Sequence, residues 1–565
     1  MIIIFFLIGM FLVFMTPMLV FMWRGDSSSL AISRGFATSM VLIWVLFLVQ
    51  YAIKLSDVEY RVLVFSTGLL AIIYALVQNK ARNREYFSNG RCFTYFSGMY
   101  MGVLVLLPLW EYVGEIFFHW DSIVSWNFWA QEIASGSWTP NETAYPVFYP
   151  ALWSLVYKIQ GTTDIWWTAK LTLLIAPFFL IAVLCSLFRE TKDRTYMFIM
   201  ILCLPYIWWE PSLSGYMDVP VMILGVMSLS LLFASDNTDD MKLSNKYLLL
   251  AFILAGVSSV VKQSGIAFVL FCTLYTWFFN SRRMTKIEVT RLSLISLSFY
   301  ASFLVVFFQH NSNPFSNLSH LMTLTGGTSV GISEIDLWPL VMTKMKAVWN
   351  NLIFIDSGDR VVFPYQVAGL IVILGTIAST FFYIRTRTSL SRLGFASFLF
   401  FWLGTFVWLQ FFSYDYRNGV WAFSFWIISC SIAASYLISN STINNYFDFS
   451  FISKIGLSYR KFVRKHDGGK LVFRICLTFF SSLLFLLVFF FENLDDLAYK
   501  NQINQQERID NVHVARSLNE LLANSGECVK VFTNRLLLPY NYHMNSYKDK
   551  IATMAVFAKP LIDSI

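Results

Sequence analysis

Long apolar stretches separated by short polar segments run along most of this 565-residue chain. The first three cover Ile2–Met22, Phe36–Ile53 and Val62–Val77. Each is near the ~17–25 residues that an α-helix needs to cross the hydrocarbon core of a bilayer. Comparable stretches follow near 93–112, 164–188, 196–210, 217–234, 247–261, 264–280, 289–309, 361–384, 393–412, 418–438 and 472–491. The pattern predicts an all-α polytopic membrane protein with a transmembrane bundle of about 13–14 helices.

Basic residues collect in a few of the polar segments between these stretches: Lys80–Arg91, Arg189–Arg194, Arg282–Lys286, Arg385–Arg392 and Arg460–Lys470. Because cytoplasmic loops carry an excess of Lys and Arg, we place all of them in the cytoplasm. An even number of crossings must then separate consecutive loops, which requires that the short apolar piece 146–160 does not cross. This piece carries Pro146, Pro150 and Lys158, and we expect a helix lying along the outer surface of the membrane.

This topology predicts the domain organisation. It comprises additional N-terminal spans at 1–92, a core of spans at 93–310 with a first outer loop at 113–163, an extracytoplasmic loop at 311–360, C-terminal spans at 361–492 and a small extracytoplasmic tail at 493–565. The tail has the composition of a soluble segment, with an amphipathic helix expected near 507–524 and a strand-like run at Cys528–Phe532. The N-terminal spans carry few polar residues, so we expect them to act as a scaffold or a partner contact.

Composition narrows the choice of partners. Hydrophobic residues make up 57% of the chain and charged residues 13%, against about 25% charged residues in a soluble domain. A net charge of +8 would suggest nucleic acid in a soluble protein, but here the basic residues lie in short loops. We therefore expect membrane lipids and no nucleic acid as partners. The seven Cys residues form no CxxC pair and indicate neither a disulfide framework nor a zinc site.

Nucleotide-binding motifs are missing from the sequence. It contains neither GxxxxGK[ST] nor a GxGxxG that follows a strand. ATP-driven transport and a cytosolic nucleotide-sugar site are therefore not expected. Any donor has to reach the outer face by itself, which indicates a group carried on a lipid.

The first outer loop holds the leading candidate for chemistry, Asp121. The loop is long, rich in Trp and Tyr, and nearly free of Lys and Arg. Trp120 and Trp126 flank Asp121 at the boundary between water and lipid, where Trp concentrates. A carboxylate there can accept a proton from a hydroxyl or hold a divalent cation against a phosphate. The alternative is that Asp121 only caps the helix that follows it.

Three further candidates lie on the same predicted face. Asp218 opens an apolar span, and acidic residues at membrane depth are costly and usually functional; the alternative is a helix cap two positions before Pro220. Lys262 interrupts two apolar runs at a turn, where it either contacts a lipid phosphate or extends to water. Arg417 can clamp a phosphate or form a local ion pair with Asp415.

Short motifs follow one another in a fixed order between about residues 110 and 280. They are Trp120-Asp121 with Ala134-Ser135-Gly136, then Tyr145-Pro146 to Tyr149-Pro150, then Gly215–Pro220 (GYMDVP), and then Lys262–Gly265 (KQSG). This order resembles the GT-C superfamily of membrane glycosyltransferases, within it the family-39-like branch of protein O-mannosyltransferases and the lipid A aminoarabinose transferase. The match weakens after residue 290. Several relatives carry an acidic pair where this chain has Asp121 followed by Ser122, so the resemblance leaves metal dependence open.

The resemblance implies a GT-C-like bundle and an inverting hexosyl- or pentosyltransferase that takes a sugar from a polyprenyl-phosphate donor. The acceptor would be an envelope glycan, lipid or protein. The implied place is the bacterial inner (plasma) membrane, with the active site facing the periplasm or exterior. The implied site comprises Asp121 and Asp218 as catalytic carboxylates, which are also the ligands if a divalent cation (Mg²⁺ or Mn²⁺) is bound; Lys262 and Arg417 as contacts of the donor phosphate; and Trp120, Trp126, Tyr149, Gln263 and Tyr216 as substrate contacts.

Two other functions stay open. A transporter or flippase of lipid-linked sugars would distribute charges through the bilayer depth and often carries internal repeats, whereas this sequence shows no related halves. An O-antigen polymerase or ligase would rely on a large outer loop rich in Arg and His. The 310–360 loop offers only His310, His320 and Arg360 of these types.

Overall fold

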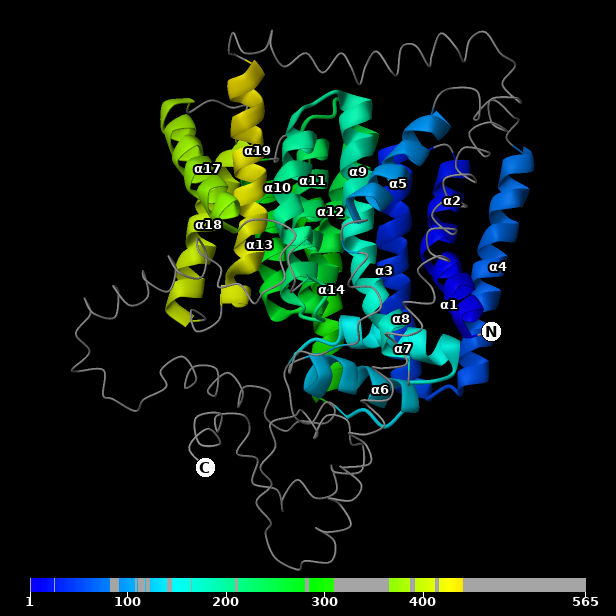
Figure 1. Ribbon diagram of the computed structural model, residues 1–565. Coiled ribbons are helices and arrows are strands. Elements are labelled where there is room, and N and C mark those ends of the chain that lie inside the picture. The colour runs from blue at the N-terminus through cyan, green and yellow to red at the C-terminus, as the bar shows by residue number, and fades with distance from the viewer. Residues whose placement is uncertain are drawn as a thin grey trace, which may run out of the picture.

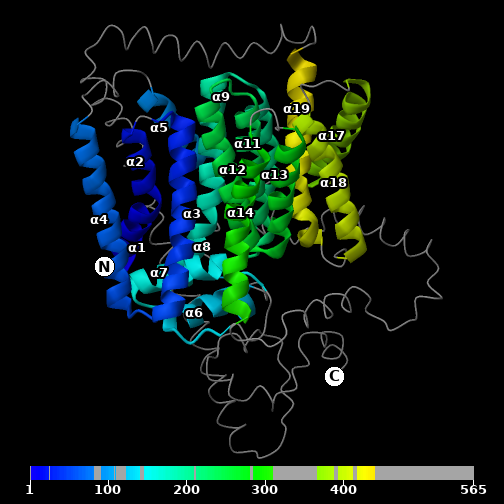
Figure 2. The same cartoon turned by 180° about the vertical axis from the view of Figure 1, so that it is seen from behind.

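The computed structural model describes a helical bundle in residues 2–24, 26–81, 91–106, 109, 117, 122–139, 145–163, 165–208, 212–279, 284–308, 365–386, 392–411 and 416–439. The predicted outer loop 311–360, the span 472–491 and the tail, with its helix near 507–524 and its strand Cys528–Phe532, lie outside the described residues. Figures 1 and 2 show the long helices side by side, with a layer of shorter helices across one end.

Every regular element in the described ranges is a helix. The N-terminal part comprises α1 (Ile2–Met10), η1 (Phe11–Met15), α2 (Thr16–Trp23), α3 (Ser28–Ile53), α4 (Asp57–Ala81) and α5 (Arg91–Leu106). The layer across one end contains η4 (Ser122–Asn127), α6 (Phe128–Ser135), α7 (Phe148–Gln160), α8 (Trp166–Leu171) and η5 (Thr172–Leu174). The remaining elements are α9 (Ile175–Thr191), α10 (Thr195–Ile207), α11 (Asp218–Asp236), α12 (Met241–Val261), η7 (Gln263–Gly265), α13 (Ile266–Phe279), α14 (Lys286–Phe308), α17 (Tyr365–Thr386), α18 (Arg392–Phe411), η11 (Tyr416–Ala422) and α19 (Phe423–Ser439).

Seven helical segments of the described part are long and apolar enough to cross a bilayer. They are Ile4–Met22, Ser28–Ile53, Trp166–Thr191, Asp218–Asp236, Met241–Val261, Lys286–Phe308 and Asn418–Leu437. Shorter apolar helices occur at Ser97–Leu106, Thr195–Ile207, Gln263–Phe279 and Arg392–Trp408. The prediction of an all-α, polytopic integral membrane protein is confirmed at this level.

Helix ends differ from the hydropathy prediction where polar first turns are present. The apolar run predicted a span at 247–261, but α12 begins six positions earlier, at Met241. Asp240 precedes this helix, and its carboxylate accepts a hydrogen bond from the backbone N–H of Lys242 at 2.9 Å. Such a cap satisfies a backbone donor that the first turn leaves without a partner, so the helix starts in a segment that hydropathy does not detect.

Helix α11 is the central helix of the bundle. All its residues from Asp218 to Ser235 are buried. Its neighbours approach closely through small residues: a Cβ added to Gly225 would lie 2.1 Å from the Phe268 ring on α13. The Ser424 hydroxyl of α19 donates to the carbonyl of Met222 at 2.9 Å, which fixes α19 against α11. Close packing at small residues and hydrogen bonds between helices are the usual means of association in membranes.

The long helices from α9 to α13 alternate in direction, as Figures 1 and 2 show. The start of α11 and the turn between α12 and α13 therefore lie at the end of the bundle that carries α6, α7 and α8. Helix α7, the piece predicted not to cross, runs across the ends of the long helices. All thirteen of its residues are buried in the protein, and its place along the outer membrane surface stays a prediction.

Candidate functional site

Side chains from three separate segments meet at the covered end of the bundle. The Lys262 ammonium donates to Asp218 Oδ1 at 2.5 Å and to Asn418 Oδ1 at 2.8 Å. Asp218 is the first residue of α11, Lys262 follows the last residue of α12, and Asn418 belongs to η11. The sequence predicted Asp218 and Lys262 as parts of one site, and the structure joins them directly.

Asp218 owes its position to the start of the central helix. The residue before it, Met217, is the cap residue and has no side-chain hydrogen bond to the helix. The carboxylate of Asp218 instead faces Lys262, while the partial positive charge of a helix N-terminus favours an acidic residue in this first turn. Pro220 fits two positions later because the first backbone N–H groups have no partner within the helix. The arrangement favours an ion-pair role over helix capping.

A tight turn presents Lys262. Its own backbone is extended (φ −153°, ψ 151°), and its N–H donates to the carbonyl of Ser258 at 3.3 Å. A Cβ added to Gly265 would lie 2.1 Å from the Ser258 carbonyl oxygen. Only glycine therefore lets the start of α13 press directly on the end of α12, and this contact explains the Lys-x-x-Gly pattern.

Asn418 was missed by the sequence reasoning, which named only the adjacent Arg417. It lies in the 3₁₀ turn η11, which leads into α19. A Cβ added to the next residue, Gly419, would lie 2.9 Å from the Trp408 ring of α18. The available signal was a polar amide in an outer turn beside an Arg, which is too common a pattern to single out.

The pair is shielded but not closed to solvent. The side chain of Asp218 is 7% exposed and that of Lys262 is 14% exposed. An ammonium has three N–H donors, of which Asp218 and Asn418 take two. In the described part of the chain no side chain takes the third donor. The arrangement can therefore offer a charged hydrogen bond to an incoming anion while Asp218 holds the lysine in place.

One oxygen of this carboxylate is already taken by the lysine, and metal dependence stays a prediction. The Lys262 ammonium lies 2.5 Å from Asp218 Oδ1 and takes the place that a divalent cation would need on that oxygen. Among the described residues, no group of three or more His, Cys, Asp and Glu side chains is close enough to hold a metal. Asp121, the other predicted ligand, lies outside the described residues.

The segment that follows Asp121 contacts the turn that leads into Asp218. The Ser122 hydroxyl is buried and donates to the carbonyl of Ser214. Gly215 has φ +92°, and a Cβ there would lie 2.7 Å from Ser122 Oγ and 2.9 Å from the Phe117 ring. Glycine is required at this position both by its left-handed backbone and by the close approach. The first outer loop thus packs against the Gly215–Pro220 motif.

The structure describes some of the remaining predicted site residues and leaves others outside the described part. Trp120 lies outside the described residues, and so does the side chain of Arg417, although its backbone belongs to η11. Trp126 is buried, with its ring 5.2 Å from Trp129 and 5.8 Å from Tyr145 between centroids.

Tyr149 is also buried, and its ring packs against Phe148 and Trp153. Burial raises the pKa of the Tyr149 phenol, so this hydroxyl stays neutral at physiological pH. Tyr216 and Gln263 are half-buried and adjoin Met217 and Lys262 in sequence. A role of these residues in holding a sugar stays a prediction.

Comparison with known proteins finds no match to this chain among protein-family models, curated proteins or solved structures. The resemblance to the GT-C superfamily therefore stays a prediction from the motifs.

Proposed function

We propose that this protein is an inverting membrane glycosyltransferase of the GT-C type. It takes one sugar, a hexose or pentose, from a polyprenyl-phosphate donor and transfers it to an envelope glycan, lipid or protein. The reaction takes place at the extracytoplasmic end of the bundle, in a bacterial plasma membrane. The observation that carries the proposal is the Lys262 ammonium at one end of a membrane bundle, held by Asp218 and Asn418 and with no side chain of the described residues on its third N–H donor.

This arrangement suits a phosphate at the membrane boundary. A lysine is a common point-charge partner of phosphate, and a shielded setting strengthens its interaction with developing charge. The neighbouring carboxylate holds the ammonium in place without closing it off. A lipid carrier brings the phosphate to this depth, so no soluble donor has to enter.

The proposed reaction forms one bond and breaks one. Asp121 accepts the proton of the acceptor hydroxyl, whose oxygen attacks the anomeric carbon of the donor sugar. The bond from this carbon to the phosphate oxygen breaks on the opposite face, which inverts the configuration. Lys262, with Arg417 from η11, stabilises the negative charge on the departing polyprenyl phosphate. Lys262 supplies charge that a Mg²⁺ or Mn²⁺ ion at Asp218 would otherwise provide.

The test uses the full chain in lipid nanodiscs with polyprenyl phosphate carrying a radiolabelled hexose or pentose. The double variant Lys262→Met with Asp218→Asn removes the cation without leaving an unpaired buried carboxylate. We expect transfer to fall by roughly 10²–10³-fold, the usual loss when one charge-stabilising donor is removed. Lys246→Met is the matched control, because Lys246 lies on the same helix at its other end and pairs only weakly with Asp26, at 3.5 Å.

Other outcomes separate the alternatives. Labelled donor that crosses the bilayer without transfer would indicate a flippase and reject the proposal. Transfer of an oligosaccharide from a diphosphate carrier would indicate a polymerase or ligase. Full activity of an Asp121→Asn variant would remove the proposed base.

A further inference from the structure

A second buried lysine holds the helix α7 in place. The side chain of Lys158, near the end of α7, is 4% exposed. Its ammonium donates to Asp57 Oδ1 at 3.0 Å and to the carbonyl of Leu55 at 3.1 Å. Both acceptors belong to the start of α4 and the turn before it. Because a buried ammonium is costly unless it is paired, this contact fixes the end of α7 to the α3–α4 turn.

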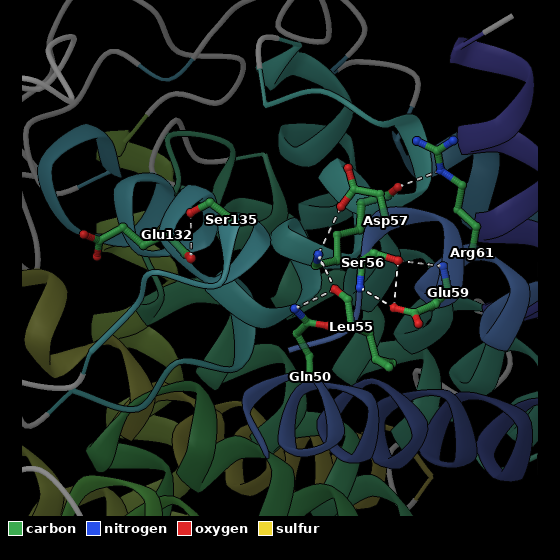
Figure 3. Close-up of polar contacts among 9 residues, drawn as sticks. Gln50, Leu55, Ser56, Asp57, Glu59, Arg61, Glu132 and Ser135 are labelled. Carbon is green, nitrogen blue, oxygen red and sulfur yellow. Dashed lines mark hydrogen bonds and ion pairs between the residues drawn. The ribbon is translucent and has the colours of Figure 1, made fainter. Parts of the chain in front are cut away.

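Further bonds from the N-terminal helices reinforce the same junction, as Figure 3 shows for Gln50, Leu55, Asp57 and Arg61. The Arg61 guanidinium donates through Nε to the carbonyl of Lys158 at 2.9 Å. Gln50, near the end of α3, donates to the Leu55 carbonyl at 3.4 Å. Helix α4 and the turn before it therefore hold the last turn of α7 through charged or polar groups, and Gln50 of α3 bonds to that turn.

Helix α7 in turn contacts the segment that follows Asp121. The Tyr157 hydroxyl, one residue before Lys158, donates to the Asn127 side-chain oxygen at the end of η4. At the other end of η4, Ser122 bonds to Ser214 in the turn that leads into Asp218. Hydrogen bonds thus connect the α3–α4 turn to α7, α7 to η4, and η4 to the turn before Asp218.

We infer that the α3–α4 turn is a positioning element for the transfer site, in which Asp57 and Arg61 set the place of η4 through Lys158 and α7. This inference rests on the proposed function, since it concerns the loop that carries Asp121. It gives the N-terminal helices a role that their apolar sequence does not reveal. Neither Asp57 nor Arg61 touches the substrates; they act through the position of α7.

The test replaces Asp57 by Asn in the full chain and measures two properties in nanodiscs. The first is hydrogen exchange of the backbone amides in 122–135, which requires no enzymatic activity. We expect exchange there to rise at least about tenfold, while exchange in the 218–235 segment of α11 stays unchanged. The second is steady-state transfer, for which we expect a reduced kcat with unchanged binding of polyprenyl phosphate, because Lys262 and Asn418 are untouched.

Asp26→Asn is the matched control. Asp26 pairs with Arg34 at 2.6 Å, near the opposite end of α3, so this variant also breaks an ion pair of the N-terminal helices. It should leave exchange in 122–135 and kcat unchanged. Asp57→Glu should restore most of both properties.

Unchanged exchange in 122–135 would overturn the inference, whatever the protein's activity. Increased exchange across all helices would also overturn it, because Asp57 would then only support the fold. If exchange rises in 122–135 alone but the wild-type protein transfers no sugar, the positioning contact stands and the proposed function fails.

Discussion

Two lysines with the same local sequence pattern form different kinds of ion pair at one end of this molecule. Lys158 and Lys262 each lie three residues before a glycine, in Lys158-Ile-Gln-Gly161 and Lys262-Gln-Ser-Gly265. Each bonds to an aspartate on another helix. In the Lys158 pair the ammonium is buried and the carboxylate of Asp57 is 48% exposed. In the Lys262 pair the carboxylate is the more deeply buried partner.

This difference in burial separates a structural contact from a binding site. A buried ammonium with a hydrated carboxylate holds two helices together and has no charge to offer to a ligand. A buried carboxylate behind a partly accessible ammonium holds its lysine in place and leaves the cation as the more exposed partner. Desolvation is costly for any charge without a partner, so the member of each pair that meets water decides what the pair can bind.

The glycines that follow the two lysines also differ in what they contact. Gly161 ends α7 with φ +77°, and a Cβ there would meet the Nη2 atom of Arg61 at 2.0 Å. Gly265 instead presses on the backbone of α12, at the Ser258 carbonyl. Gly161 ends α7 next to the flexible side chain of Arg61, whereas Gly265 allows a tight turn between α12 and α13.

The largest difference between the two pairs is expected in the stability that each loses when its lysine is replaced. In Lys262→Met the carboxylate of Asp218 stays buried without its partner, and we expect a loss of about 3–5 kcal/mol in the free energy of unfolding. In Lys158→Met the half-exposed carboxylate of Asp57 stays hydrated, and we expect a loss within ~1 kcal/mol from the pair itself. Chemical or thermal unfolding of the purified variants measures both values.

The double variant Lys262→Met with Asp218→Asn is the control for this prediction. It removes the unpaired charge and should recover most of the lost stability. Equal losses in the two single variants would mean that burial of the carboxylate does not distinguish the pairs.

Replacing the glycine that follows each lysine should cause a smaller loss of stability and should affect phosphate binding at one site only. Gly265→Ala forces a Cβ against backbone atoms that cannot turn away, and we expect a loss of about 1–3 kcal/mol together with loss of polyprenyl-phosphate binding. Gly161→Ala displaces only the end of the Arg61 side chain and strains a left-handed residue, at a cost of about 1–2 kcal/mol. It should leave phosphate binding intact. Unfolding and binding of polyprenyl phosphate are measured on each variant.

Gly136→Ala calibrates the strain part of this prediction. Gly136 has φ +76°, and an added Cβ meets nothing within 4 Å. Its loss of stability therefore reports the backbone strain alone. Phosphate binding that survives Gly265→Ala would show that the turn does not set the position of Lys262.

The sequence predicted most of the bundle because lipid imposes a simple pattern. Long apolar runs marked the spans, and polar first turns such as that of α12 shifted their ends. It also predicted that Asp218 and Lys262 belong together, since alternating helices bring the start of one and the end of the next to the same face. The pattern Lys-x-x-Gly occurs at both lysines, however, and local sequence does not reveal which lysine is buried.

The other parts of the site depend on contacts between distant segments. Asn418 reaches Lys262 from a position 156 residues away, and nothing in its own neighbourhood indicates this. The ion pair of Asp57 with Lys158 joins residues that lie 101 positions apart in the sequence. The short apolar piece that becomes α7 runs across the ends of the long helices, and its burial depends on contacts with helices that are distant in sequence.

The smallest expected effect concerns the other acidic residue in the first turn of α4, Glu59. Its carboxylate accepts hydrogen bonds from the Ser56 hydroxyl at 2.7 Å and the Ser56 N–H at 2.8 Å, and the Glu59 N–H donates back to the Ser56 hydroxyl at 3.3 Å. This is a capping box, and the bonds from the Ser56 side chain and backbone lower the pKa of Glu59 below its usual 4.5.

A lowered pKa in the folded state means that the ionised carboxylate contributes stability above pH 4.5 and loses it as the pH falls through the folded-state pKa. Glu59→Gln keeps the size and the hydrogen-bonding oxygen but does not titrate. The wild-type protein should therefore be slightly more stable than this variant at pH 7, and the difference should vanish as the pH falls below 4.5. Thermal unfolding of both proteins across this range measures the effect. A difference independent of pH would show that the charge of Glu59 does not support the start of α4, and that Asp57 alone among the acidic residues of this turn contributes through its charge.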